Sequence, residues 1–357
     1  MPSSVYVTFD ELNPNSGAGT VCLHELEALK KVSDMAQIIS QKDLGALKHY
    51  QFNPFIADYF AARAYSGPEG VDLLHLSCSP GLALLDRIRP RHYVVNCPAH
   101  DLKTSIEEHE SYYGKGSYSF VHNTDSVLHE LLLRHAKYAD AMITPSTSSA
   151  RWIKENIQPK RIEVISHGCD IPDTISPLPA EFRVGYLGAF GPDKSLHLLL
   201  LAWKYFSGNG KLVFGGSCKD GVLWLANQMG IQLTPDRYEL TGWVKNISDF
   251  YNNISVYCQV SASEGFGIET IEAMAAGRPV IVSSGAGSAD AVTDGVDGFV
   301  VPARDPKALL DKLIFFRDNP GKIAEMGVKA REKAKEYSWE MVEQKYIQFY
   351  KGILGGN

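Results

Sequence analysis

The stretch SASEGFGIETIEAMAAG, residues 261–277, places a short glycine turn, GFG at 265–267, before a segment with helical periodicity. That segment ends at Gly277, a residue type typical of helix C-termini. The residues before the turn, ISVYCQV at 254–260, form an apolar run typical of a buried strand. A strand, a glycine turn and a helix in this order predict a phosphate site, because the N–H groups at a helix N-terminus attract anions.

Three carboxylates lie beside this predicted anion site: Glu264, Glu269 and Glu272. We interpret Glu269 through helix physics, because a negative charge in the first turn complements the helix dipole by about 0.3–1 kcal/mol. Glu264 and Glu272 need a partner that donates hydrogen bonds, since a carboxylate only accepts them. A sugar nucleotide carries a diphosphate between two hydroxylated rings. The pattern therefore predicts that one carboxylate contacts the ribose and the other contacts the transferable sugar.

Strand-like apolar runs alternate with helix-like segments on both sides of this stretch, which predicts parallel sheets covered on both faces. The strand-like runs are 4–9, 71–77, 92–97, 140–145 and 161–168, and then 182–188, 211–216, 237–242, 254–260, 278–283 and 298–303. The helix-like segments are 21–32, 126–139, 148–157, 195–206, 306–319 and 339–354.

Residues 169–182, CDIPDTISPLPAEF, interrupt the alternation with three prolines and no periodicity, and we expect a domain linker there. The length of 357 residues fits two domains of about 150–200 residues each. The sequence thus predicts two doubly wound α/β domains. Ligands bind at the carboxyl ends of strands in such sheets, so we expect the site in a cleft between the domains.

Composition excludes several classes of protein. The net charge of -6 does not support general nucleic-acid binding. The longest strongly apolar run, 196–203, is far shorter than a membrane span. The basic run RIRPRH, 87–92, has too few charges to support contact with a membrane surface, and we interpret it as a solvated loop. The cysteines form no CxxC pair, so we expect reduced thiols in a cytoplasmic protein without a zinc site.

The motif EGFGIETIE, with Glu264 and Glu272 separated by seven residues, resembles the E-x7-E motif of family 4 retaining glycosyltransferases, which have the GT-B fold. The resemblance runs over nearly the whole chain and is densest between 182 and 305. It implies two Rossmann-like domains that face a central cleft, with a C-terminal helix that crosses back to the first domain. The implied parts are an acceptor domain at 1–175, a nucleotide-sugar donor domain at 176–337 and the returning helix at 338–357.

The resemblance also implies roles for the residues of the motif. The family's first glutamate contacts the donor sugar near its 3-hydroxyl, and the second binds the ribose, which correspond to Glu264 and Glu272. Backbone N–H groups of the turn, at Gly265, Phe266 and Gly267, would hold the sugar hydroxyls and phosphates.

A second segment, GAFGPDKSLHLLL, resembles the family's G-R-L-x-x-x-K-G sequence. Its Lys194 matches the lysine that neutralises the diphosphate, where a cation stabilises the departing leaving group. The family's arginine falls on Ala189, which is a departure from the pattern.

Three first-domain residues match the family less specifically. NSGAGTVCLHEL resembles its glycine loop, so that Gly17 and Gly19 would approach the donor or acceptor; an ordinary strand-to-helix turn is the alternative. VVNCPAHDLKT places His100 after a strand, where the family often has a histidine facing the reaction centre; a polar cap is the alternative.

In the second half, TGWVKN resembles the stretch that borders the nucleobase, which suggests Gly242, Trp243 and Val244 as donor-binding residues. His75 and His167 also lie near predicted strand ends, and we interpret both as structural.

Together these observations predict transfer of a hexosyl group from a nucleoside-diphosphate sugar, such as a UDP- or GDP-sugar, to a hydroxyl of a glycan, lipid or small molecule, with retention. Glu264, Lys194 and His100 are the candidate catalytic residues. The sequence has no DxD, so we expect neither a metal nor another cofactor. The alternatives are a catalytically silent sugar-nucleotide-binding protein, motivated by Ala189, and a GT-B sugar-nucleotide epimerase. A dinucleotide oxidoreductase lacks its GxGxxG motif in the required context.

Overall fold

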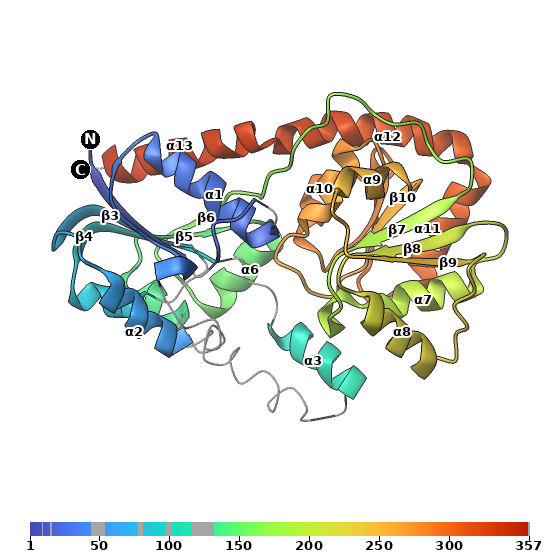
Figure 1. Cartoon of the computed structure of the whole chain (residues 1–357), viewed down its shortest axis with the longest axis horizontal. Coiled ribbons are helices and arrows are strands. Elements are labelled where there is room, and N and C mark those ends of the chain that lie inside the picture. The colour runs from blue at the N-terminus through green and yellow to red at the C-terminus, as the bar shows by residue number, and fades with distance from the viewer. Residues whose placement is uncertain are drawn as a thin grey trace. The chain divides into compact units, whose positions relative to one another are not determined.

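The computed structural model divides into two units (Figure 1). One unit contains Met1–Ala99, Gly116–Gly168 and Trp339–Asn357, and the other contains His100–Lys115 and Cys169–Ser338. The structure describes residues 1–8, 10–14, 16–43, 54–77, 81–97, 102–113, 115 and 132–355.

The first unit is built on a six-stranded parallel sheet with the order β2-β1-β3-β4-β5-β6. Its strands are β1 (Ser3–Thr8), β2 (Asp34–Ile39), β3 (Gly70–Ser77), β4 (Arg89–Asn96), β5 (Ala141–Thr144) and β6 (Ile162–Val164). Its helical elements are α1 (Gly17–Lys30), α2 (Pro54–Ala64), η2 (Leu82–Asp86), α6 (Thr147–Asn156) and α13 (Trp339–Gly355), with a further helix at 132–138.

Two features of this sheet differ from the sequence prediction. The sequence pattern did not predict β2. This strand lies at the edge of the sheet and is only partly buried, so its sequence does not form the continuous apolar run of a central strand. The interpretation of RIRPRH as a loop was wrong for its second half, since Arg89 to His92 open β4. These residues form a strand because they pair with β3, where Arg89 lies opposite Gly70 and His92 lies opposite Leu73.

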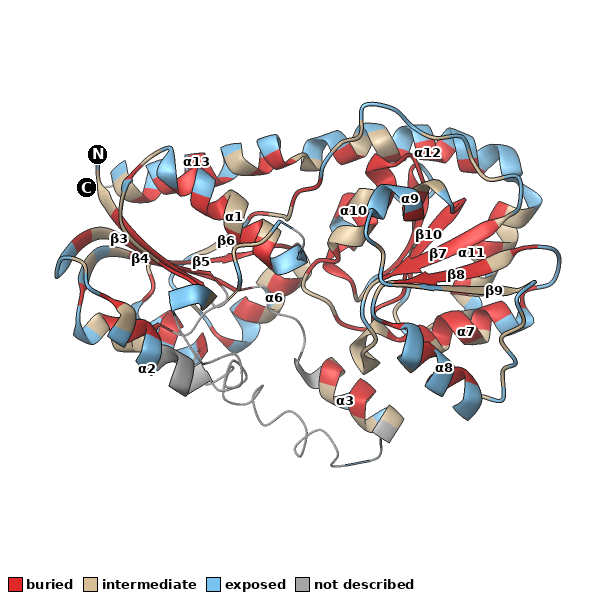
Figure 2. Cartoon of the chain, viewed as in Figure 1, coloured by how far each residue is buried: buried red, intermediate tan, exposed pale blue. Residues whose placement is uncertain are grey.

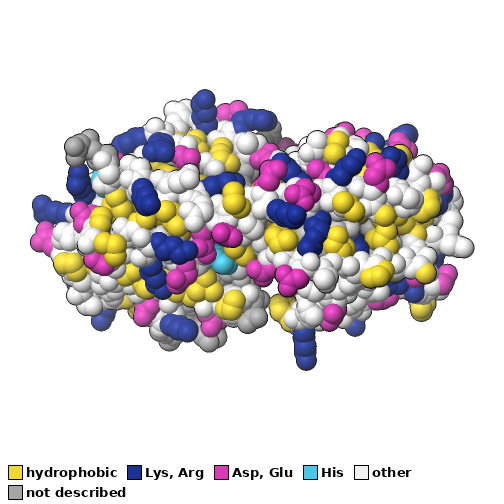
Figure 3. All heavy atoms as spheres, turned by 90° about the horizontal axis from the view of Figure 1, so that it is seen from above, with side chains coloured by type: hydrophobic (Ala, Val, Ile, Leu, Met, Phe, Trp, Pro, Cys, Tyr) yellow, Lys and Arg dark blue, Asp and Glu magenta, His cyan; other side chains and the backbone are white. Residues whose placement is uncertain are grey.

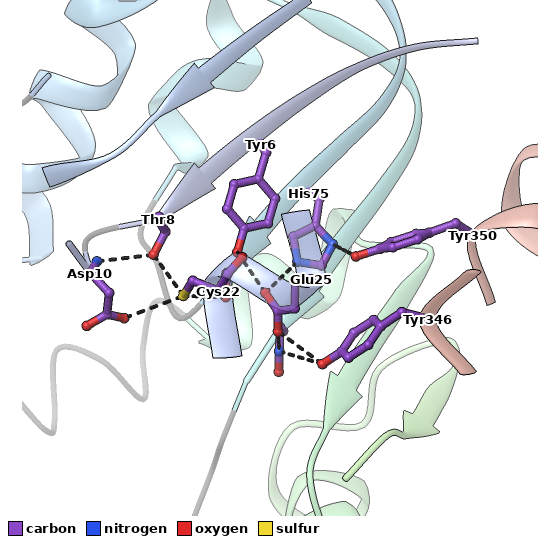
Figure 4. Close-up of polar contacts among 10 residues, drawn as sticks. Tyr6, Thr8, Asp10, Cys22, Glu25, His75, Tyr346 and Tyr350 are labelled. Atoms are coloured by element: carbon purple, nitrogen blue, oxygen red, sulfur yellow. Dashed lines mark hydrogen bonds and ion pairs between the residues drawn. The ribbon is translucent and has the colours of Figure 1, made fainter. Parts of the chain in front are cut away.

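A buried polar network in this unit surrounds Glu25, a fully buried residue of α1 (Figure 4). Its carboxylate accepts hydrogen bonds from the Tyr6 hydroxyl at 2.8 Å, the Tyr346 hydroxyl at 3.0 Å and the Asn96 amide. It also lies 3.5 Å from Nε2 of His75. Burial would raise the pKa of Glu25, but hydrogen bonding and charge from His75 outweigh it and lower the pKa. A buried carboxylate is tolerated because it is paired in this way.

The network attaches the C-terminal helix to the first unit. Tyr346 and Tyr350 come from α13, and the Tyr350 hydroxyl lies 3.3 Å from Nδ1 of His75 in β3. At the other end of the helix, Trp339 stacks on His24 of α1 with ring centroids 4.0 Å apart. These contacts place α13 on the unit that also contains the N-terminus of the chain. His75 is thus part of the core, as its structural interpretation requires.

The second unit contains another six-stranded parallel sheet, with the order β12-β11-β10-β7-β8-β9. Its strands are β7 (Arg183–Leu187), β8 (Lys211–Gly215), β9 (Tyr238–Gly242), β10 (Val256–Gln259), β11 (Val280–Ser283) and β12 (Gly298–Val301). Its helical elements are α3 (Leu102–Tyr113), η3 (Pro192–Lys194), α7 (Leu196–Tyr205), α8 (Lys219–Gln228), α9 (Ile247–Asn252), α10 (Ile268–Ala275), η4 (Gly287–Ala291), α11 (Pro306–Asp318), α12 (Pro320–Ala334) and η5 (Lys335–Tyr337).

Both faces of this sheet are covered. In Figure 1, α7 and α8 lie on one side of the strands, and α9, α10 and α12 lie on the other. The strands β7, β8 and β10 between them are buried (Figure 2), which explains their nearly continuous apolar sequence. The prediction of two doubly wound α/β domains is therefore confirmed. In this strand order the topological switch point lies between β7 and β10.

The predicted linker, residues 169–182, contains no helix and no regular strand. It is held against the second unit by two arginines. The nearly fully buried Arg278 donates hydrogen bonds to the carbonyl oxygens of Ser176 at 3.1 Å and Pro177 at 3.3 Å. Arg331 donates to the carbonyl oxygen of Pro172. The segment is therefore a packed strap on this unit and not a free tether.

On the face seen in Figure 3, basic side chains are interspersed with acidic ones and form no continuous patch of one sign. Among the helices that the structure describes, none is long and apolar enough to cross a membrane.

We expect Tyr346→Phe to lower the free energy of unfolding by about 1–2 kcal/mol, because it leaves a buried carboxylate with one donor fewer. Urea unfolding monitored by circular dichroism measures this. The matched control is Tyr205→Phe, a tyrosine that is 67% exposed. Equal urea midpoints for the two variants would contradict a role of the Glu25 network in holding α13.

Candidate active site

Two loops at the switch point of the second sheet bring a lysine and a glutamate together. Strands β7 and β10 are neighbours in register, with Val256 opposite Val184 and Tyr257 opposite Gly185. Because both strands are parallel, the loops at their carboxyl ends meet. The first loop contains Lys194 at the end of η3, and the second contains Glu264. Nζ of Lys194 forms an ion pair with Oε1 of Glu264.

The second oxygen of Glu264 is held from its own strand. Oε2 accepts a hydrogen bond from the Ser261 hydroxyl at 2.7 Å and another from the Gln259 amide. The Tyr257 hydroxyl in turn donates to Oε1 of Gln259 at 2.7 Å, which orients this amide. The main chain of Glu264 is also bonded, since its N–H donates to the carbonyl oxygen of Gly285 at 3.0 Å. The carboxylate is thus fixed in one orientation.

Charge pairing sets the ionisation of both groups. Burial favours a high pKa for Glu264, but the Lys194 ammonium and the hydrogen bonds from Ser261 and Gln259 lower that pKa overall. Burial likewise disfavours the charged form of Lys194, yet Glu264 and Glu269 raise the pKa of Lys194. Both side chains retain some exposure, 21% for Lys194 and 12% for Glu264, so a ligand can reach them.

The glycine turn leads directly into α10. Gly267 has φ 93, a left-handed conformation that favours glycine, and it stands at the N-cap without a side-chain hydrogen bond to the helix end. A Cβ at this position would lie 3.4 Å from the Glu264 carboxylate. Phe266 is buried with its ring facing the core, so only its main chain can take part in binding. The N-terminus of α10 therefore lies beside Glu264, as an anion site requires.

The other two glutamates of the motif lie in partly buried positions with raised pKa values. Glu272 accepts a hydrogen bond from the Tyr251 hydroxyl at 2.7 Å, and burial raises its pKa to about 8. Burial, and then repulsion from Glu264, raise the pKa of Glu269 to about 7. The carboxylate next to Lys194 is therefore ionised at neutral pH, whereas Glu272 is largely protonated. This difference reduces the negative charge beside the helix N-terminus.

Two family models match successive parts of the chain. One is described as Glycosyltransferase Family 4 and matches residues 21–172, and the other is described as Glycosyl transferases group 1 and matches residues 176–337. Together the two models match most of the chain, which belongs to the glycosyltransferase family that they describe. The resemblance that the sequence predicted is therefore confirmed.

Curated relatives agree with this assignment. The D-inositol 3-phosphate glycosyltransferase of Kribbella flavida is 29% identical over 225 residues, which cover 54% of this chain and 51% of that protein. An uncharacterized glycosyltransferase of Methanocaldococcus jannaschii is 24% identical over 344 residues, which cover 94% of this chain and 85% of the relative. The chain thus spans about half the length of the Kribbella relative, and most of the archaeal one.

Solved structures with the same architecture include a sucrose-phosphate synthase from Thermosynechococcus elongatus, with a TM-score of 0.79 and 19% identity over 99% of this chain and 100% of the other. HepE of Anabaena in complex with UDP-glucose has a TM-score of 0.70 and 17% identity over 98% and 99% of the two chains. The GT-B fold is confirmed by this similarity.

The nucleobase candidates of this glycosyltransferase lie at the same edge of the second sheet. Gly242 ends β9 with φ 68, and its carbonyl oxygen accepts a hydrogen bond from the N–H of Gly216 at 2.8 Å. Trp243 follows with 72% of its surface exposed, whereas Val244 packs partly against the core. An exposed indole after the carboxyl end of β9 is available to a ligand ring, and its contact with the nucleobase stays a prediction.

The first-domain candidates have different surroundings. Gly17 is the first residue of α1 and has open space around its Cα, so no steric demand requires glycine there. Gly19 is buried, its N–H donates to the Ser16 hydroxyl at 3.1 Å, and a Cβ would lie 2.4 Å from the carbonyl oxygen of Glu11. Close packing alone therefore explains Gly19. His100 lies outside the described residues, and Ala189 is exposed at the position of the family's arginine.

Sequence reasoning missed the residues that hold the carboxylates in place. These are Tyr251 at Glu272, and Gln259 and Ser261 at Glu264. A polar Gln259 at the end of an apolar strand was the available signal, whereas Tyr251 comes from α9 and reaches Glu272 only in the folded chain. The dipole interpretation of Glu269 is incomplete, because this residue also interacts with Lys194 and Glu264.

We expect Glu272→Gln to change the pH dependence of stability. The folded-state pKa of about 8 lies above the ordinary 4.5, so the folded protein binds this proton more tightly than the unfolded chain does. The free energy of unfolding should therefore fall as pH rises between about 4.5 and about 8. Glutamine stays neutral, so the variant does not lose this stability. The melting temperature of Glu272→Gln minus that of wild type should therefore be more positive at pH 8.5 than at pH 5.5. Calorimetry at both pH values tests this, and the exposed Glu340→Gln is the control. The same change of melting temperature with pH in wild type and in Glu272→Gln would contradict the raised pKa of Glu272.

Proposed function

We propose that this glycosyltransferase transfers a hexosyl group from a UDP- or GDP-sugar to an acceptor hydroxyl, with retention at the anomeric carbon. The observation that supports this most directly is the Lys194–Glu264 ion pair beside the N-terminus of α10. It combines a cation suited to a diphosphate with a carboxylate suited to sugar hydroxyls, next to main-chain N–H groups suited to phosphate oxygens.

In this proposal the donor replaces one partner of each charged group. The Lys194 ammonium turns to the diphosphate, and Glu264 accepts hydrogen bonds from hydroxyls of the transferable sugar. The ribose lies at Glu272, whose carboxyl is already oriented by Tyr251. The main chain of Gly265, Phe266 and Gly267 binds the phosphates.

The two units take different roles. The second unit, around 176–337, binds the donor, and the nucleobase lies against Gly242, Trp243 and Val244. The first unit, within 1–175, binds the acceptor, and the helix after residue 338 completes it. Gly17, Gly19 and His100 remain candidates for contact with the donor or acceptor.

The proposed reaction breaks the bond between the anomeric carbon and the phosphate oxygen, and forms a bond from the acceptor oxygen to the same face. The proton of the acceptor hydroxyl passes to the departing phosphate oxygen. The transition state has oxocarbenium character, and negative charge grows on the diphosphate. Lys194 and the N-terminus of α10 stabilise that charge, while Glu264 holds the sugar in place.

A catalytically silent sugar-nucleotide-binding protein is the second candidate, because Ala189 provides no cation where the family has an arginine. The test is a panel of UDP- and GDP-sugars with glycan, lipid and small-molecule acceptors, beginning with UDP-glucose because HepE was solved with that compound. Release of the nucleoside diphosphate and an α-linked product from an α-linked donor, observed by NMR, are expected. Nucleotide binding without release from any pair would favour the silent protein, and an inverted product would refute retention.

We expect Glu264→Gln to reduce transfer by about 100-fold or more, because the amide keeps the shape of the side chain but not its charge. The rate of nucleoside-diphosphate release measures this, and an unchanged melting temperature shows that folding is intact. Glu163→Gln, at a partly exposed glutamate of β6, is the matched control. Wild-type turnover in Glu264→Gln would remove Glu264 from the site.

We expect Lys194→Ala to weaken binding of UDP or GDP by about ten- to hundredfold, because a charge-assisted contact contributes about 1.5–3 kcal/mol. Isothermal titration calorimetry measures the dissociation constant. The control is Lys204→Ala, an exposed lysine in the last turn of α7. Equal affinity of the two variants would exclude the diphosphate role of Lys194.

A further inference from the structure

The helix α3 packs against the turn that contains Lys194. In chain order α3 lies between β4 and β5, two strands of the first sheet, yet residues His100–Lys115 belong to the second unit by their contacts. The helix contacts η3 directly. One helix from the first half of the sequence therefore packs within the second unit.

Glu108 is the central contact of this helix. Its side chain is only 7% exposed. Oε1 accepts a hydrogen bond from Nε of Arg304 at 2.5 Å, and Oε2 accepts one from the Ser195 hydroxyl at 3.3 Å. A buried carboxylate is stable only with such partners, so the two contacts are constraints on all three residues.

Both partners of Glu108 have an unusual backbone. Ser195 has φ 52 and Arg304 has φ 63, and the only other described non-glycine residue with positive φ is Gln158. A left-handed conformation costs a non-glycine residue about 1–2 kcal/mol, and it persists where surrounding contacts enforce it. Glu108 supplies such a contact at both positions.

Ser195 follows Lys194 directly and joins η3 to α7. The N–H of Ser195 donates to the carbonyl oxygen of Pro192 at 3.0 Å, which closes the turn. On its other side the turn is tied to the Glu264 loop, since the N–H of Ala262 donates to the carbonyl oxygen of Asp193 at 2.8 Å. The main chain of Lys194 is thus held between Glu108 and the loop of its ion-pair partner.

A second side chain of α3 supports the same turn. The Tyr112 hydroxyl shares a hydrogen bond with Nδ1 of His197, in the first turn of α7. The Tyr112 ring also meets Phe190 edge-on, with centroids 6.4 Å apart. Since Phe190 precedes η3 and His197 follows it, α3 contacts both ends of the lysine turn.

We propose that Glu108 is a positioning residue for the nucleotide-sugar donor: it fixes Ser195, and thereby sets Lys194 where its ammonium can meet the diphosphate. This role rests on the proposed function. Glu108 acts through Ser195 and touches no reacting atom.

The test compares Glu108→Ala with Glu107→Gln, a control on the next residue of α3. Glu107 also pairs with Arg304, at 3.1 Å, but this pair is exposed and contributes little. The first readout is hydrogen–deuterium exchange of the ligand-free protein over residues 190–199. Glu108→Ala should increase exchange there, while the control should match wild type. Unchanged exchange in Glu108→Ala would overturn the proposal.

The second readout is the dissociation constant of UDP and of GDP, each alone, together with KM for the donor. Glu108→Ala should raise both about tenfold while kcat changes less, because the lysine is displaced and not removed. Adding Ser195→Ala to Glu108→Ala should cause little further loss of nucleotide affinity, because in this proposal Glu108 acts through Ser195. Faster exchange with unchanged affinity and KM would overturn the positioning role.

Glu108→Gln separates the two contacts of Glu108, because the amide oxygen can still accept from Ser195, whereas the NH2 group replaces the acceptor opposite Nε of Arg304. It should recover most of the nucleotide affinity, and affinity as low as that of Glu108→Ala would contradict action through Ser195. If wild-type protein binds neither UDP nor GDP, the proposed function fails and the donor role of Glu108 fails with it. Normal wild-type binding with a wild-type-like Glu108→Ala refutes the role of Glu108 alone.

Discussion

The ion pair between Lys194 and Glu264 is the interaction on which the candidate site depends. Each group is partly buried, and neither would be stable as an isolated charge in that position. The pair forms because β7 and β10 are adjacent at the switch point, so two loops far apart in the sequence end at one place. In the proposed function, the diphosphate and the sugar of the donor take over both partners of the pair.

The pair also explains why three glutamates can surround an anion site. Lys194 neutralises Glu264, the only one of the three whose pKa is lowered. Burial raises the pKa of Glu272 to about 8, and burial with repulsion from Glu264 raises that of Glu269 to about 7, so at neutral pH Glu272 is largely protonated and Glu269 carries only part of its charge. The N-terminus of α10 therefore faces less negative charge than the sequence implies. A protonated carboxyl at Glu272 can also donate a hydrogen bond, in addition to accepting the one from Tyr251.

Support for this pair extends outward through several elements. Ser261 and Gln259 orient the glutamate, whereas α3 braces the turn that bears the lysine. In the first unit the buried Glu25 network has a similar structural effect, because it attaches α13 to α1, β1 and β3. In both units a buried carboxylate joins elements that are distant in sequence, and its need for partners makes the arrangement specific.

The sequence by itself determined the class of fold and predicted the main candidate site residues. Short, nearly continuous apolar runs predicted central strands such as β7 and β10, because a strand buried on both faces needs apolar side chains at nearly every position. The spacing of Glu264 and Glu272 and the glycine turn predicted the donor motif, since that chemistry is encoded in one continuous stretch. Only the tertiary structure decided the pairing of Lys194 with Glu264, the pKa values of the three glutamates, the edge strand β2 and the position of α3 on the second unit. These depend on burial and on contacts between residues as far apart as Glu108 and Ser195, for which local sequence contains no signal.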